Sequence, residues 1–176
     1  RRLEQRLAGG SVQAQLHRLH AIWVGQALEG LQQGQRDGAD RFVGHAREMT
    51  GLSTQLPTMV ERGAQPFQLL LVYRDDVARM ELRLVSHGLE QAGAESIGQR
   101  PSAVVLARWE GATGSFKYLD AQGQWHADWP AAEVPPTALP RAIGIDRGDA
   151  QGWLLVAAPL ARGEPLARRV DAERMP

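Results

Sequence analysis

The spacing of apolar residues divides the chain into a helical first part and a longer part with the period of β-strands. In the first part, most apolar positions follow one another at three or four residues, the repeat of one helix face. They are Leu3, Leu7, Val12, Leu16, Leu19, Trp23, Ala27 and Leu31. We therefore predict a long helix over about residues 2–33, ended by the glycines of QQGQRDG. Gly9 and Gly10 either kink it or place its start at Ser11.

Two segments in the middle of the chain predict a pair of neighbouring strands. PFQLLLVYR, residues 66–74, is apolar at both alternating sets of positions, which is typical of a central strand. In VARMELRLVS, residues 77–86, apolar and charged residues alternate: Met80, Leu82 and Leu84 against Arg79, Glu81 and Arg83. This alternation predicts a strand with one face in the core and one in water, joined to the first through Asp75 and Asp76.

Further short segments extend the β-rich part of the chain. They are RFVG (41–44), SAVVLARWEG (102–111), SFKYLD (115–120), and PRAIGID with GWLLVAAPL (140–146 and 152–160) as a final antiparallel pair. The number of strands in residues 45–101 stays open. We predict one α+β domain over residues 1–176, with a long N-terminal helix packed against antiparallel β-sheet(s), a β-rich region over about 41–160 and a polar tail at 162–176.

Composition excludes several classes of function. Twenty basic residues balance twenty acidic ones, which argues against nucleic acid or an anionic membrane surface as the main partner. No segment approaches the roughly 20 apolar residues that span a bilayer. Cysteine is absent, so disulfides, thiolate metal sites and cysteine nucleophiles are excluded. The chain begins with Arg1 rather than Met, from which we expect a processed or shortened product.

Few residues are spaced for catalysis or metal binding. His17 and His20 are three apart, as two ligands of one metal can be, but no third ligand is suggested, and His45 with Glu48 is a weaker example. No G-x-S-x-G motif is present. We therefore expect no metal, no cofactor and no catalytic residues.

The segment FKYLDAQGQWHADWP, residues 116–130, allows two interpretations. Asp120 and Asp128 flank a group of aromatic residues, so a carbohydrate site with two carboxyl groups is one possibility. The other is a β-turn in which Asp120 begins the turn and Gly123 takes a positive φ, with Trp125 and Trp129 packed against the protein.

The same segment, followed by LPRAIGI at residues 139–145, resembles the C-terminal signature of the J-type minor pseudopilins of type II secretion, also called general secretion pathway protein J. The family shows an aromatic–x–Tyr/Phe–Leu–Asp segment, a turn glycine, a Trp, a Trp-Pro pair, and then Leu-Pro-x-Ala-Val/Ile. The matching residues are Phe116, Tyr118, Leu119, Asp120, Gly123, Trp125, Trp129, Pro130, Leu139, Pro140, Ala142 and Ile143. The family's basic leader, cleavage motif and apolar helical half are missing here.

The resemblance implies a structural protein without an active site. It implies a domain in the periplasm of a bacterium, anchored in the inner membrane by a segment that this chain lacks. J-type members join I-type and K-type pseudopilins in a complex at the pseudopilus tip, and contacts with the outer-membrane channel or secreted proteins are further expectations. Such packing needs an uncovered apolar stripe, which Leu3, Leu7, Val12 and Leu16 supply.

Two alternatives remain beside this interpretation. One is a minor pilin of a type IV pilus, against which the absence of cysteine argues. The other is a small carbohydrate-binding or hydrolytic domain that uses Trp125, Trp129, Asp120 and Asp128. Sugar binding needs aromatic faces in solvent, whereas a scaffold predicts that at least one tryptophan is buried.

Overall fold

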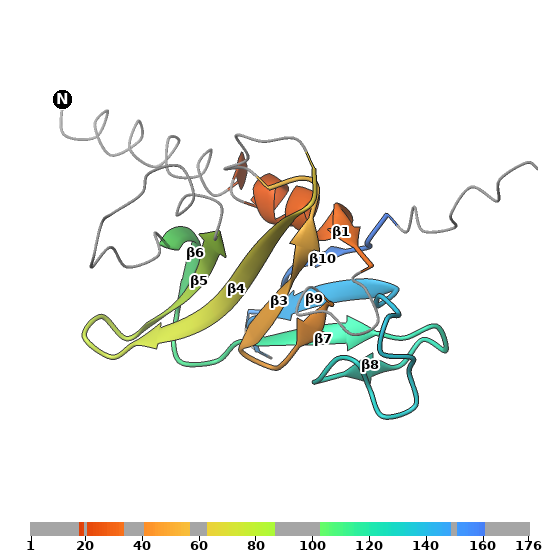
Figure 1. The fold of residues 1–176 in the computed structure, drawn as a ribbon. Helices are drawn as coiled ribbons and strands as arrows, with labels where there is room; N and C mark the ends of the chain where they lie inside the picture. Colours follow the sequence, from red (N-terminus) through yellow and green to blue (C-terminus); the bar gives the residue numbers. More distant parts are fainter. Residues whose placement is uncertain are drawn as a thin grey trace, which may run out of the picture.

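The computed structural model describes residues 18–19, 21–33, 41–56, 63–86, 103–148 and 151–160. Two antiparallel sheets and a short helix make up this part of the chain (Figure 1). Within it, no helix is long and apolar enough to cross a membrane.

The first sheet contains the longest strands. Its members are β1 (Leu31–Gln32), β2 (Val43–Gly44), β3 (Glu48–Ser53), β4 (Gln65–Arg74), β5 (Arg79–Ser86) and β6 (Ala103–Glu110). They are ordered β1-β3-β4-β5-β6, and β2 also pairs with β3. The strands β3 to β6 follow one another along the chain, so each pairs with the next as an antiparallel meander.

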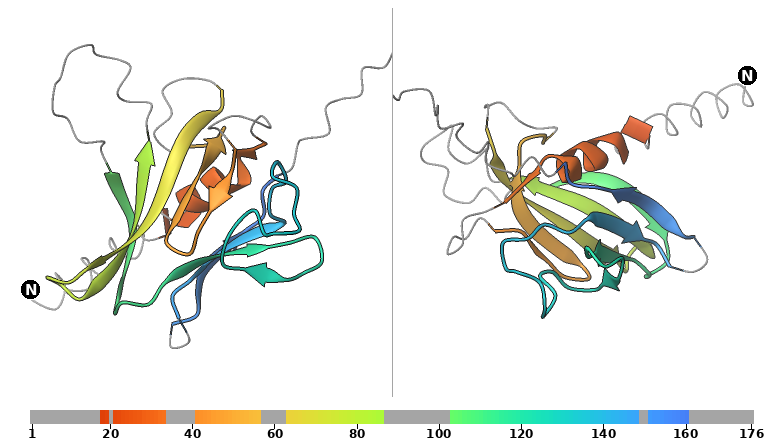
Figure 2. Two further views of the ribbon diagram at one scale, coloured as in Figure 1. Left: turned by 60° about the horizontal axis from the view of Figure 1, so that its bottom comes forward. Right: turned by 90° about the vertical axis from the view of Figure 1, so that its right-hand side faces the viewer.

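The second sheet is built from the C-terminal part of the described chain. Its strands are β7 (Ser115–Leu119), β8 (Trp125–His126), β9 (Ala142–Asp146) and β10 (Trp153–Ala157), in the order β10-β9-β7-β8. In the left view of Figure 2, β4 to β6 form one wall of the molecule and the second sheet forms another. Backbone hydrogen bonds between Gly44 and Trp129, and from Phe116 to Ala46, join the two sheets.

The core lies where the inner faces of both sheets meet the helix. Each strand contributes alternate residues, because successive side chains point to opposite faces. The buried apolar residues include Phe67, Leu69 and Leu71 of β4, Met80, Leu82 and Leu84 of β5, Phe116 and Tyr118 of β7, and Ile143 and Ile145 of β9. The helix adds Val24, Ala27 and Leu28, and it lies alongside β10 (Figure 2, right).

The predicted α+β fold with a long N-terminal helix packed on a sheet is wrong. Strands account for 48% of the described residues, and the described helix covers only residues 21–29, with residues 18 and 19 also helical. Residues 1–17, where we expected the first half of the helix, lie outside the described residues.

The helix ends earlier than the sequence pattern suggested because the chain after Gly30 joins a sheet. Leu31 and Gln32 pair with β3 instead of continuing the helix. The hydroxyl of Ser53 donates to the carbonyl of Ala27 at 2.7 Å, and the Thr54 amide donates to the carbonyl of Gly30 at 3.0 Å. These bonds satisfy carbonyl groups that a helix end leaves without intrahelical partners. Leu31 is buried in the strand and also fits the apolar repeat of the helix, so the apolar pattern alone could not distinguish the two conformations.

Several strand predictions are confirmed. β4 is a central strand, Met80, Leu82 and Leu84 point into the core, and β9 and β10 form the final antiparallel pair. RFVG contains only the two residues of β2. The strand β3 was not predicted at all.

Glu81 does not face water as the alternation of β5 suggested. It is only 5% exposed, and its carboxylate accepts hydrogen bonds from Arg83 on its own strand and from Arg108 on β6. Burial acts to raise the pKa of Glu81, but the hydrogen bonds and charges of the two arginines outweigh it and lower that pKa.

Gly44 allows the two sheets to approach each other. A Cβ at this position would lie 2.2 Å from the ring of Tyr118, a side chain that is itself fully buried. We expect Gly44→Ala to lower the free energy of unfolding by about 1–3 kcal/mol, because an overpacked core forces neighbouring groups to shift. Urea unfolding of both proteins measures the difference.

Gly25 in the helix provides the matched control for this substitution. A Cβ at Gly25 would meet no atom within 4 Å. Gly25→Ala should therefore raise the free energy of unfolding by about 0.5–1 kcal/mol, the helix-propensity difference. Equal effects of the two alanines would contradict the contact assigned to Gly44.

Candidate functional site

The turn between β7 and β8 is organised by the carboxylate of Asp120. This side chain accepts hydrogen bonds from the backbone amides of Gln122 and Gln124, at 2.9 and 2.8 Å. Gly123 has a φ of 86°, a conformation that favours glycine. The turn interpretation is thus confirmed for Asp120 and Gly123, but it was wrong to place Trp125 against the protein, since that side chain is 41% exposed.

His126 completes the surroundings of Asp120. Its Nε2 lies 2.6 Å from Oδ2 of Asp120. The hydrogen bond with His126, together with those from the two backbone amides, lowers the pKa of Asp120. An ionised carboxylate with three partners is poorly suited to act as the general acid of a glycoside hydrolase, which needs a raised pKa.

Asp128, the other carboxyl group of the proposed sugar site, has a separate partner. Its Oδ1 lies 3.0 Å from Nδ1 of His45, and both side chains are exposed. His45 and Glu48, whose spacing offered a weak example of two metal ligands, are bonded only through their backbones, from the His45 amide to the Glu48 carbonyl. The glutamate side chain accepts from Gln68 instead.

Trp129 is buried and joins the two sheets. It is 2% exposed, its indole N–H donates to the carbonyl of Ala138 at 2.8 Å, and the Trp129–Pro130 bond is cis. Its ring lies 6.5 Å from that of Tyr118, which makes an edge contact with Phe42 at 5.9 Å. This finding fits the expectation that at least one tryptophan is buried.

Tyr118 is fixed at both ends of its side chain. Its ring packs in the core, and its hydroxyl donates to the carbonyl of His45 at 2.9 Å. Burial raises the pKa of the Tyr118 hydroxyl, with a smaller contribution from the charge of Asp128. The residue therefore stays neutral and serves as a hydrogen-bond donor within the fold.

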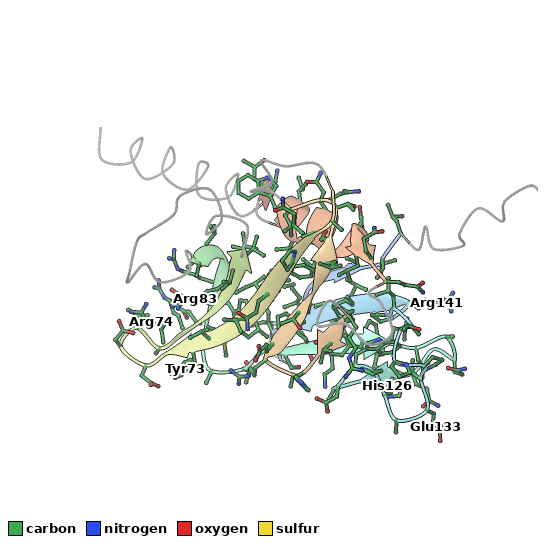
Figure 3. All side chains as sticks on the ribbon, viewed as in Figure 1. Tyr73, Arg74, Arg83, His126, Glu133 and Arg141 are labelled. Atoms are coloured by element: carbon green, nitrogen blue, oxygen red, sulfur yellow. The ribbon has the colours of Figure 1, made fainter. Side chains whose placement is uncertain are left out.

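A hollow of about 510 Å³ lies beside the Asp120 turn. Its lining residues are Asp120, Gln122, Gln124, His126, Ala131, Ala132, Glu133 and Val134. Figure 3 labels His126 and Glu133 on this side of the second sheet. Among the described residues, no group of three or more His, Cys, Asp or Glu side chains is placed to hold a metal ion.

Trp125 lies on the outer face of the second sheet, away from Trp129. Its ring centroid is 5.0 Å from that of Trp153 on β10, and the two side chains are 41% and 44% exposed. The ring of Trp153 covers Gly144 of β9, where a Cβ would lie 2.2 Å from it. Sequence reasoning had grouped Trp125 with Trp129 and missed Trp153. The alternation of Ile143, Gly144 and Ile145 was the signal that a flat outer face was available.

The residues of the predicted partner stripe are not among those that the structure describes. Leu3, Leu7, Val12 and Leu16 lie outside the described residues, as do His17 and His20. The described helix exposes Leu19 and Ile22, at 47% and 53%, while Val24 faces the core. Leu19 and Ile22 are three residues apart, so they share one solvent-facing side of the helix.

The other residues singled out from the sequence take part in core packing or in turns. Leu139 packs against the core and Pro140 is buried. Asp75 lies in the β4–β5 turn, and Asp76 accepts two hydrogen bonds from Arg74. The motif residues therefore come together as one structural unit around β7 and β9.

We expect Gly123→Val to lower the free energy of unfolding by about 1 kcal/mol or more, because valine is strained at a positive φ. No atom lies within 4 Å of a Cβ at this position, so any loss reports on the backbone alone. Gly123→Asn is the control and should lose less, since asparagine tolerates this conformation. A melting temperature unchanged by valine would disprove the strain.

The lowered pKa of Asp120 predicts a defined dependence of stability on pH. A carboxyl group with a lowered folded-state pKa stabilises the protein above the unfolded value of about 3.9, and this contribution disappears as pH falls through the folded pKa. We expect Asp120→Ala to be less stable than the parent at pH 5 and the difference to shrink towards pH 2. Chemical unfolding across this range tests it, and a difference independent of pH would exclude the charge as its cause.

Comparison with known proteins gives no family for this chain. No family model matches the sequence, and no curated protein matches it significantly.

Proposed function

We propose that the chain is a structural subunit: the periplasmic domain of a J-type minor pseudopilin of type II secretion. It would help to initiate and cap the pseudopilus through a tip complex with I-type and K-type minor pseudopilins, and so support protein export across the outer membrane. Such a domain would be held at the inner membrane by an N-terminal anchor.

The observation that carries the proposal is the use of the signature residues inside the fold. Tyr118, Asp120 and Trp129 each bond to other parts of the same chain. Gly123 shapes a turn, and Phe116 and Ile143 are fully buried. A motif used for packing and turn formation supports a scaffold whose activity lies in its contacts with other subunits.

The exposed side of the helix is the proposed contact surface. Leu19 and Ile22 leave apolar surface in water on an element whose opposite side is buried. Large apolar side chains exposed together are typical of protein–protein contacts. Leu3, Leu7, Val12 and Leu16 stay a prediction for the same interface.

One observation favours the carbohydrate-binding alternative. Trp125 and Trp153 present indole surface to solvent on the second sheet, as a sugar platform requires. The burial of Trp129 and the ionised state of Asp120 argue against the version of this site that includes hydrolysis. A minor pilin of a type IV pilus would share the structural role and differ in its partners.

Mixing the chain with the soluble I-type and K-type domains of the same system, followed by light scattering, tests the proposal. A defined complex is expected, and Leu19→Gln with Ile22→Gln should weaken it about tenfold or more. The reason is that burying the exposed half of both side chains contributes about 1.4 kcal/mol or more.

Val77→Gln is the matched control for these substitutions. Val77 is as exposed as the two helix residues but lies in the β4–β5 turn. Val77→Gln should leave the affinity of the complex unchanged. Monomers in every mixture would reject the tip-complex role, and binding of oligosaccharides that quenches Trp125 and Trp153 would favour the alternative.

A further inference from the structure

A narrow cleft lies where the helix meets β5, β6 and β10. Its volume is about 90 Å³. Seven apolar residues and two arginines line it: Ala21, Val24, Leu82, Leu106, Ala107, Leu154 and Leu155, with Arg108 and Arg147. It lies away from the Asp120 turn and shares no residue with the hollow there.

An irregularity of β10 gives the cleft its apolar wall. In a regular strand, Leu154 and Leu155 would point to opposite faces. The pairing of β10 with β9 shifts between Trp153 and Leu155, and both leucines line the cleft. Such bulges redirect side chains. Trp153 stays on the outer face, over Gly144.

The two arginines give the cleft an excess of positive charge. The guanidinium of Arg147 donates to the backbone carbonyls of Gln151 and Gly152, and it makes no ion pair with a carboxylate among the described residues. Arg108 shares the single carboxylate of Glu81 with Arg83. Arg108 is exposed, so the charged end of the cleft reaches solvent.

The size of the cleft restricts what can fill it. An apolar cavity of about 150 Å³ holds a benzene molecule, so this cleft has room for roughly three to four carbon atoms. That is one branched aliphatic side chain, and it is too little for a long acyl chain. The adjoining cations attract a carboxylate, which a guanidinium can bind with two parallel hydrogen bonds.

We propose that this cleft binds a segment of a partner polypeptide. The segment inserts one valine- or leucine-sized side chain between the helix and β10, and a neighbouring carboxylate of the same segment contacts Arg108 and Arg147. Binding interfaces can be built around an aliphatic anchor that fills a pocket, with polar contacts at the rim. The inference goes beyond the proposed function, because it rests on the cleft alone.

The inference can be tested on the full chain with small molecules that carry a branched aliphatic tail, a carboxylate, or both. 4-Methylpentanoate combines a branched aliphatic tail with a carboxylate, 4-methylpentanamide lacks the charge, and acetate lacks the tail. Titrations followed by NMR should shift the methyl signals of Leu106, Leu154 and Leu155 saturably with the first probe. The other two should bind at least about threefold more weakly, because each lacks one of the two contacts.

Three variants locate the binding. Ala21→Leu should fill the cleft and abolish the shifts while the protein melts as before. Arg108→Gln should raise the Kd about threefold or more, as expected for the loss of a partly exposed charge contact. Arg74→Gln is the matched control, because Arg74 is an exposed arginine that pairs with Asp76 away from the cleft.

Several results would overturn the inference. They are equal binding of the acid and the amide, shifts centred outside the cleft, or binding that survives Ala21→Leu. Affinity that rises steadily from 4-methylpentanoate to octanoate would identify an acyl chain as the occupant and reject a polypeptide. Should Arg108→Gln fail to fold, Ala21→Leu and the comparison of acid with amide still decide the outcome.

Discussion

The contact of Tyr118 and Trp129 with the backbone of β2 is the constraint on which the rest of the structure depends. Gly44 has no side chain, so the Tyr118 ring can lie against its backbone, and the backbone of Gly44 pairs with that of Trp129. The Tyr118 hydroxyl donates to the carbonyl of His45 in the same region. These contacts hold the second sheet against the first, and in this arrangement the inner faces of both sheets are buried.

The same constraint decides which aromatic residues remain for binding. The rings of Trp129 and Tyr118 are buried in the core. The Asp120 carboxylate accepts hydrogen bonds within its turn and is bonded to His126. In the described part of the chain, apolar surface is left at the outer side of the helix, at the Trp125–Trp153 pair, and in the cleft between the helix and β10. Surfaces of this kind agree with the proposed role in assembly. The helix side and the cleft lie on different faces of the same helix, so one element can serve two contacts.

Sequence patterns predicted local features well and distant partners poorly. The inward residues of β5, the central position of β4 and the turn of Asp120 and Gly123 were all predictable, because they follow from alternation and from the chemistry of neighbouring residues. The end of the helix was not predictable, because it depends on the pairing of Leu31 with Ser53, a residue of β3 that lies 22 positions further along the chain. Glu81 looked solvated because Arg108, its second arginine partner beside Arg83, is 27 positions away and becomes a neighbour only in the sheet.

The sequence by itself determined the β-rich character of residues 41–160, the tight turn after β7 and the absence of cysteine chemistry. These depend on residue types and short spacings. Only the tertiary structure decided that Trp125 lies beside Trp153, that Trp129 is buried, and that two consecutive leucines of β10 share a cleft with two arginines. The physical reason is that burial and pairing depend on which distant segments pack together, and the period of a single segment carries no information on its partner.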